Sequence, residues 1–264
     1  MQWFAAYLAT GAVIGFFAGL LGIGGGMTMV PILAALFAAQ SLAPAHGLHL
    51  ALGTAMAGIL FTSGSSVRQH HKLGGVDWSI VKRLGPAMAL GTLLSSFGSG
   101  WLPQGPLGLA FALIVYAGAT QIWLGRKPSA ARGLPGTAGL WAVGLAIGAI
   151  SGLVSAGGSF MSMPFMLWCG VPMRTAIGTG AALGLPVALL GTGGYIASGW
   201  QAGGLPEGSL GFVYVPALAA VVLASTLTAP FGARAAHRLP VATLRRVFAL
   251  VLYVLATKML VAYW

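Results

Sequence analysis

The chain is poor in charge, above all in acidic side chains. Only 6% of its 264 residues are charged, and two carboxylates, Asp77 and Glu207, stand against 13 lysines and arginines. A water-soluble domain of this size carries far more charge, and the mean hydropathy of +0.91 places the chain in a bilayer. Neither carboxylate lies inside a long apolar run, so the carboxylate proton relay that is usual in pumps has no candidate here.

Other absences narrow the function. The single cysteine, Cys169, excludes an internal disulfide and a paired-cysteine metal site. The sequence has no GxxxxGK[ST] phosphate loop and no spacing that suggests a nucleophile and its base, so we expect neither an enzyme nor a bound cofactor or metal. The net charge is +11, and the basic residues that produce it lie in short loops. This placement indicates a role in setting membrane topology and in contacting anionic lipids, rather than in binding nucleic acid.

Long apolar runs fill most of the chain. They show no strand-like alternation, so we expect helices rather than a barrel. Each uninterrupted run is close to the roughly 20 residues that cross a bilayer. The first run has no convincing cleavage site, and we interpret it as a membrane segment rather than a signal peptide. The runs are 3–39 (interrupted at 22–26), 48–66, 79–100, 105–124, 137–169 (interrupted at 157 and 158), 175–197, 210–232 and 242–262.

Two of these runs contain the same interrupted pattern. Residues 19–31 and 152–164 align without a gap, since residue 157 matches 24 and residue 164 matches 31, a constant offset of 133. An Ala-x-Gly-Thr sequence then follows in each half. The repeat predicts two related halves, 1–124 and 137–264, joined by the polar linker 125–136.

Loop charge indicates how the halves are oriented. Basic residues occupy 67–83, 125–136, position 174 and 233–246, whereas the loops 40–47, 101–106 and 198–209 carry none. If each interrupted run folds into a V of two shorter helices, all these basic loops lie on one side, which the positive-inside rule makes the cytoplasm.

The sequence therefore predicts an all-α polytopic membrane protein of two inverted-topology repeats. Each repeat has one glycine-broken V-shaped helix pair and three transmembrane helices. The loops expected in the cytoplasm are 67–83, 125–136, 170–174 and 233–246.

A helix that restarts after glycines presents unpaired N–H groups and the positive end of its dipole. Two such ends that face each other make an anion site, to which nearby hydroxyls can add donors. The glycines can also merely allow close helix packing, and the threonine hydroxyls can bond to the carbonyl one turn back. The candidate substrate-binding residues are Gly24, Gly25, Gly26, Met27, Thr28, Gly53, Thr54, Gly157, Gly158, Ser159, Phe160, Gly178 and Thr179.

The histidines and the lysine outside these motifs can be interpreted without a role in anion binding. His46 and His49 lie at the expected outer end of a helix, where they either gate or relay protons or are interfacial residues. His70, His71 and His237 lie in basic loops, where we expect solvated residues. Lys258 either snorkels to the outer interface, which the neighbouring aromatic residues favour, or contacts the substrate.

The glycine cluster before Met27-Thr28-Met29-Val30-Pro31, its copy before Met161-Ser162-Met163-Pro164, and the Ala-x-Gly-Thr pair resemble the TauE/SafE sulfite exporter family. The resemblance covers nearly the whole chain. It implies a small multi-pass protein of two homologous halves in a bacterial inner (plasma) membrane. The family is linked to export of sulfite and organosulfonates such as sulfoacetate, and the resemblance implies substrate contact at 22–28 and 155–160. Ser159 stands where the first copy has Gly26, so the two arms need not contribute equally.

We therefore predict a secondary transporter, an exporter of small sulfur-containing anions that works by alternating access. An anion channel and a membrane scaffold without transport are the alternatives. The expected partners are the small anionic substrate and the lipid bilayer, with a homodimer as a possible assembly and no nucleic acid.

Overall fold

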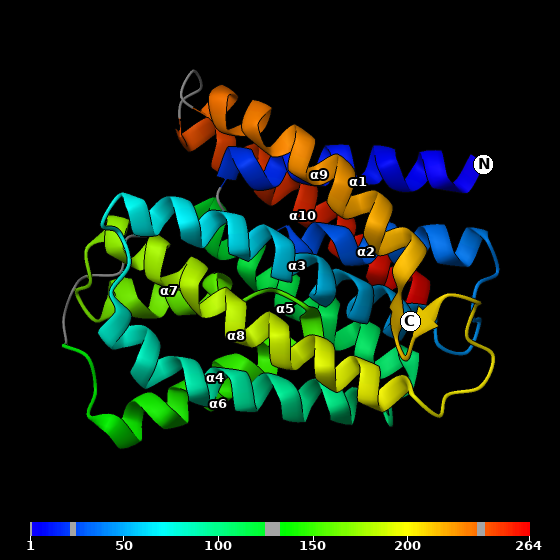
Figure 1. Cartoon of the computed structure of the whole chain (residues 1–264), viewed down its shortest axis with the longest axis horizontal. Coiled ribbons are helices and arrows are strands. Elements are labelled where there is room, and N and C mark those ends of the chain that lie inside the picture. Colours follow the sequence, from blue (N-terminus) through cyan, green and yellow to red (C-terminus); the bar gives the residue numbers. More distant parts are fainter. Residues whose placement is uncertain (1, 22–24, 125–132, 237–240) are drawn as a thin grey trace.

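The computed structural model describes residues 2–21, 25–124, 133–236 and 241–264. The described chain consists of helices and one short hairpin (Figure 1). The helices are α1 (Gln2–Leu21), α2 (Gly26–Ala39), α3 (Gly47–Lys72), α4 (Trp78–Ser99), α5 (Gln104–Leu124), α6 (Thr137–Val154), α7 (Ser159–Trp168), α8 (Met173–Gly199), α9 (Val215–Ala236) and α10 (Val241–Tyr263); the strands are β1 (Ser209–Leu210) and β2 (Val213–Tyr214).

Several helices are long and apolar enough to cross a membrane. Within the described residues these are α3, α5, α6, α8 and residues 246–263 of α10, while α1, α2 and α9 contribute shorter apolar stretches. The expectation of three spanning helices in each half is thus met only in part, because neither α4 in the first half nor α9 in the second is among the candidates. Lys82, Arg83 and several glycines, serines and threonines make α4 less apolar.

The short hairpin was not expected. The sequence suggested one apolar helix from 210, but residues 209–214 pair as antiparallel strands, with Ser209 opposite Tyr214, and α9 begins only at Val215. Gly208 (φ 82°) and Gly211 (φ 52°) adopt left-handed conformations that interrupt a helix.

The connections gather at two opposite ends of the molecule. The α3–α4 and α7–α8 connections lie at one end, and the α2–α3 and α4–α5 connections lie with the hairpin at the other (Figure 1). The first of these, which we call the basic end, carries the exposed side chains of Arg68, Lys72, Lys82, Arg83 and Arg174. We call the other one the neutral end. The predicted linker residues 125–132 and the loop residues 237–240 lie outside the described residues.

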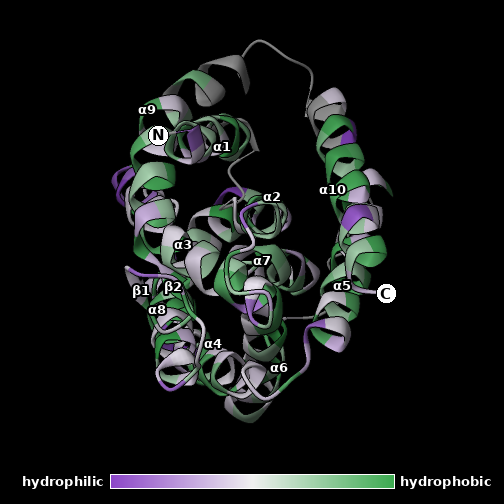
Figure 2. Ribbon diagram, turned by 90° about the vertical axis from the view of Figure 1, so that its right-hand side faces the viewer, coloured by the Kyte–Doolittle hydropathy of each residue, from purple (hydrophilic) through white to green (hydrophobic). Residues whose placement is uncertain are grey.

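Helices pack crosswise between the two halves of the sequence. α1 lies along α9, α6 lies along α4, and α5 lies beside α10 (Figure 2). Glycines spaced four residues apart permit the close approach. A Cβ on Gly11 or Gly15 would collide with the backbone of α9, and one on Gly148 would collide with that of α4. Such small-residue faces drive helix association in lipid.

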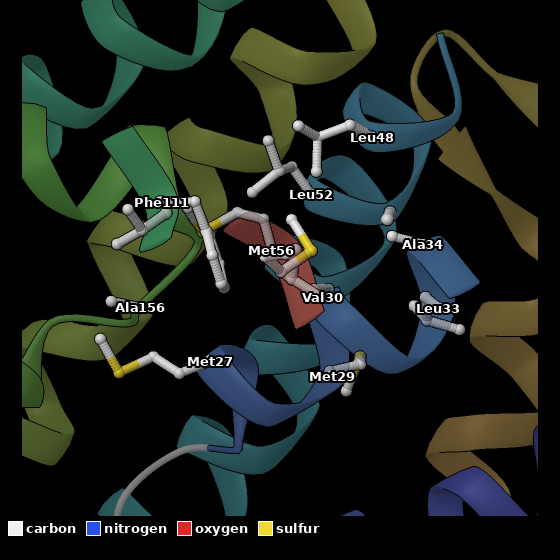
Figure 3. Packing of buried hydrophobic residues seen from close by; sticks show 14 of the residues in the cluster. Met27, Met29, Val30, Leu33, Ala34, Leu48, Leu52, Met56, Phe111 and Ala156 are labelled. Atoms are coloured by element: carbon white, nitrogen blue, oxygen red, sulfur yellow. The ribbon is translucent and has the colours of Figure 1, made fainter. Parts of the chain in front are cut away.

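The core lies around α3 and α8, which are buried along most of their lengths. Met27, Met29, Val30 and Leu33 of α2 belong to the same buried apolar cluster as Leu48, Leu52 and Met56 of α3 (Figure 3). α2 thereby places its first turn deep inside the protein. At the start of α7, Gly157, Gly158 and Ser162 are buried and Ser159–Met161 are partly exposed.

Candidate functional site

The first glycine cluster interrupts the chain between α1 and α2, as predicted. Gly24 lies outside the described residues, and Gly25 has the left-handed φ of 63° that side chains with a Cβ rarely adopt. The amide groups of Thr28 and Met29 both donate to the Gly25 carbonyl, at 3.2 and 3.1 Å, and the Thr28 hydroxyl donates to it at 2.8 Å. The two amide groups before Thr28 are first-turn donors, which have no acceptor within their own helix.

The second cluster has a similar local structure between α6 and α7. Ser155 and Gly157 are left-handed, with φ of 47° and 70°. The Ser162 hydroxyl donates to the carbonyl of Gly158, the residue before α7, at 2.5 Å. In both clusters a hydroxyl near the helix start therefore anchors the residue that precedes the helix. The Ser155 hydroxyl donates to the Leu52 carbonyl of α3 at 2.8 Å and ties this cluster to the other half.

The two clusters meet at one side chain, Ile59, in the middle of α3. A Cβ on Gly26 would lie 2.6 Å from Cδ1 of Ile59 and would collide with the carbonyl of Ser155. A Cβ on Gly157 would lie 3.5 Å from Cγ2 of the same isoleucine. The turns before α2 and α7, distant in sequence, are thus in contact halfway along a buried spanning helix.

The start of α7 rests on the middle of α8. A Cβ on Gly158 would lie 2.7 Å from the amide nitrogen of Gly184, and one on Gly180 would lie 3.1 Å from Cβ of Ser159. Each helix restart therefore packs on the long helix of its own half. The side chain of Phe160 instead packs against Gly118 of α5, so only its backbone can take part in a site at the cluster.

A small cavity opens beside the first restart. Its volume is about 10 Å³, and a cavity of this size holds roughly one water molecule. Sulfite has four heavy atoms, so the space that the described residues leave beside this restart is too small for it. The cavity is lined by Gly25, Gly26, Met27, Thr28, Ala156 and Phe248.

The Gly-Thr pairs have a different role in this structure. The carbonyl of Phe212 lies against Gly53, and the amide of Tyr214 donates to the Thr54 hydroxyl at 2.9 Å. In the other half, the carbonyl of Gly75 lies against Gly178, and the amide of Asp77 donates to the Thr179 hydroxyl at 2.9 Å. In each pair, glycine admits a carbonyl and threonine binds the amide two residues later.

We call these contacts the neutral clamp (Gly53-Thr54 with Phe212–Tyr214) and the basic clamp (Gly178-Thr179 with Gly75–Asp77). The neutral clamp holds the segment that leads into α9, and the basic clamp holds the segment that leads into α4. In each case the segment belongs to the half of the chain opposite to its Gly-Thr pair. Thr54 also donates to the Leu50 carbonyl at 2.6 Å, so its hydrogen-bonding groups are used inside the protein. The role of Gly53, Thr54, Gly178 and Thr179 as substrate ligands stays a prediction, which this arrangement does not support.

Sequence reasoning missed three residues at the centre: Ile59, Gly184 and Phe248. Ser155 lies at the start of the stretch 155–160 where the family resemblance implied substrate contact, and it introduces a hydroxyl where the aligned repeat has Gly22. Ile59, Gly184 and Phe248 belong to no motif, and only packing of distant helices brings them to the site.

The described residues contain no group of three or more His, Cys, Asp or Glu side chains that could hold a metal ion. Cys169 follows α7 at the basic end as a half-buried free thiol, and burial raises its pKa. The candidate site thus offers backbone amides, hydroxyls and apolar walls.

Long apolar helices and backbone donors buried halfway along them define the class as a multi-pass membrane transport protein. The chain belongs to the TauE/SafE family, since the model of the family described as "Sulfite exporter TauE/SafE" matches residues 7–259. It is 35% identical over 254 residues to a "Probable membrane transporter protein" of Haemophilus influenzae, with 96% of each chain covered.

A second relative is more distant. The "Probable membrane transporter protein YdhB" of Bacillus subtilis is 26% identical over 195 residues, which cover 71% of this chain and 77% of that protein. No solved structure matches the chain. These relatives agree with a membrane transporter and name no substrate beyond the sulfite of the family description.

Proposed function

We propose that the protein is a secondary transporter that exports small sulfur-containing anions such as sulfite or organosulfonates. The observation that carries the proposal is the meeting of the two helix restarts, before α2 and α7, at Ile59 in the middle of α3. First-turn and turn amide groups of Gly25–Met27 and Gly157–Phe160 would hold the anionic head there.

The electrostatics of two helix starts suit a single negative charge. Each helix start carries roughly half a positive charge. At about 4 Å and an effective dielectric constant of about 20, two such ends attract one anion by about 4 kcal/mol. That attraction offsets part of the cost of removing a small anion from water. The apolar surroundings, Met27, Ile59, Ala156 and Phe248, keep competing water out.

Three packing features support the inverted repeats, 1–124 and 137–264. The α1–α2 pair has its free ends at the neutral end, and the α6–α7 pair has them at the basic end (Figure 1). α1 packs on α9 as α6 packs on α4. The two clamps also correspond, one in each half. We propose that the basic end faces the cytoplasm of a bacterial inner membrane.

The two clamps support a mechanism of alternating access. With both closed, the cavity admits about one water. Release of the neutral clamp would free the segment before α9, and release of the basic clamp would free the segment before α4. The anion would then reach Ile59 from one end at a time, as in other transporters with inverted repeats.

The test is exchange of a labelled anion in proteoliposomes. Proteoliposomes that contain the protein and are loaded with unlabelled sulfite, sulfoacetate or methanesulfonate should take up the labelled anion by counterflow. Gly26→Ala should abolish this exchange, because the new Cβ meets Ser155 and Ile59. Gly98→Ala is the matched control, since a Cβ there meets nothing within 4 Å.

Each alternative has its own signature in the same preparation. A channel would show conductance far above carrier turnover and no stimulation by anion on the far side. A scaffold would show no flux and no anion-dependent rise in melting temperature. Unchanged exchange in a folded Gly26→Ala protein would refute the proposed site.

A further inference from the structure

The neutral end contains a buried histidine that the anion site does not use. His49, the third residue of α3, is 2% exposed. Among the buried side chains that the structure describes, it is the only histidine, lysine, arginine or carboxylate. An ionisable group buried in a membrane helix is costly and is by default a candidate for function.

The hydrogen bonds of His49 identify the atom that can titrate. Its Nε2 lies 3.0 Å from the carbonyl oxygen of Ser99 and 3.1 Å from that of Leu102. Carbonyls only accept, so Nε2 carries a hydrogen in both charge states of the ring. Nδ1 is therefore the atom that gains or loses a proton. It is buried and has no hydrogen-bond partner among the described residues.

A second histidine connects this atom to the surface. His46 precedes α3 and is half-buried, and its Nδ1 is also buried without a partner in the described part of the chain. The two rings lie 5.8 Å apart between centroids, and both pack on Phe212, at 5.4 and 5.1 Å. Because His46 is partly exposed and His49 is not, His46 can pass a proton inward.

Few other titratable groups surround the pair. α8 contributes Tyr195, which packs against Gly53 and donates its hydroxyl to the Gly152 carbonyl at 2.7 Å. Ser99 at the end of α4 and Leu102 in the α4–α5 connection contribute carbonyls, which do not titrate, and the hairpin contributes the ring of Phe212. Glu207 lies exposed in the loop at this end.

We propose that His49, reached through His46, binds a proton that moves together with the anion; this inference rests on the proposed anion transport. Burial and the nearby start of α3 both disfavour a positive ring. An anion in the protein offsets this penalty. Ten helical residues, about 15 Å, separate His49 from Ile59. At an effective dielectric constant of about 20, one negative charge at that distance raises the proton affinity about sixfold.

The neutral clamp gives the pair a second, mechanical link to transport. Phe212 supports both imidazole rings, and its carbonyl lies against Gly53 in that clamp. Because burial penalises the charged ring, a bound proton favours the state in which water reaches His49. Proton binding therefore favours release of the neutral clamp.

The proton enters with the anion while one clamp is released and leaves with it while the other is released, so that one proton with one monovalent anion makes the cycle electroneutral. Its direction then follows the sum of the two concentration gradients, and export needs only an anion gradient that exceeds the opposing proton gradient. By reciprocity, the anion raises the affinity for the proton as much as the proton raises that for the anion.

The experiment uses labelled methanesulfonate, which stays a monovalent anion near neutral pH, in proteoliposomes whose membrane potential is clamped at zero. An inside-alkaline gradient of about one pH unit should drive the wild-type protein to about tenfold accumulation, since one proton per anion carries that driving force. In His49→Gln, the amide nitrogen replaces the Nε2 donor but cannot titrate. This variant should retain exchange at equal pH and accumulate nothing above equilibrium.

His71→Gln is the matched control, because His71 is exposed at the basic end; it should accumulate like the wild type. Accumulation by His49→Gln, or exchange without accumulation in the wild type, would overturn the proton site and leave anion transport intact. Absence of exchange from the wild type with every anion would refute both. If His49→Gln does not fold, a measurement on the wild type decides. Uptake of methanesulfonate must lower the internal pH, which a pH-sensitive dye trapped in the proteoliposomes reports, and uptake without this acidification would overturn the proton site.

Discussion

The basic clamp offers the sharpest single perturbation of the transport cycle. In Thr179→Val, the side chain keeps its shape and loses the hydroxyl that accepts the Asp77 amide at 2.9 Å. An amide left without a partner in a buried place costs about 1–3 kcal/mol. The substitution should therefore raise the population that is open at the basic end between about fivefold and 150-fold.

Cysteine accessibility measures that population. In a Cys169→Ser background, Ser63→Cys places a reporter on α3 beside Gly184, on the basic side of Ile59. Ala55→Cys places one on the neutral side, next to the neutral clamp. Both positions are buried in the closed structure. Thr179→Val should accelerate labelling of the first by a membrane-impermeant maleimide in inside-out vesicles and leave the second unchanged.

The mirror experiment completes the test. Thr54→Val removes the acceptor of the Tyr214 amide, at 2.9 Å, and should accelerate labelling at Ala55→Cys from the neutral face only. Thr179→Ser and Thr54→Ser keep a hydroxyl at the clamp. Reporter proteins with these substitutions should therefore be labelled at the same rate as reporter proteins with the original threonine. Equal acceleration at both reporters would mean general destabilisation, and no acceleration at either would mean that the clamps are not gates. Both results would refute the reasoning.

Two further predictions concern the centre and the orientation. Ile59→Ala removes the side chain between the glycine clusters; it should lower stability by about 2–5 kcal/mol, as measured by thermal unfolding, and let larger sulfonates exchange. An unchanged size limit would exclude Ile59 as the barrier. Cys169 should react with an impermeant maleimide only from the cytoplasmic face, whereas Gly203→Cys in the Cys169→Ser background should react from outside. Because burial raises the pKa of the Cys169 thiol, its labelling rate should keep rising with pH beyond the ordinary range of a thiol. Reversed sidedness would invert the proposed topology.

The sequence predicted the breaks between helices better than it predicted the site. The two glycine clusters fall where α2 and α7 begin, because consecutive glycines, and left-handed residues such as Gly25 and Gly157, end a helix whatever surrounds them. The long runs 48–66 and 175–197 became α3 and α8 with only shifted ends. These features depend on local chemistry, which a single sequence contains.

The sequence could not predict which distant residues contact one another in the folded protein. The Gly-Thr repeat was visible, but whether its hydroxyls face an anion or a backbone amide depends on where residues 75–77 and 212–214 pack. The hairpin at 209–214 was hidden in an apolar run, and Ile59 resembles any other apolar residue of a buried helix. Motifs indicate which residues are special, and packing decides what they contact.

The crosswise packing of α1 on α9 has a consequence for biosynthesis. Gly11 of α1 needs the backbone at Val221 as its partner, about 210 residues later in the chain. At a synthesis rate of about 5–20 residues per second, α1 waits roughly 10–40 s in the membrane before that partner is made. During this interval its glycine face is open to other helices. The first half therefore cannot mature alone, and the newborn chain depends on insertion machinery or lipid to shield that face until α9 arrives.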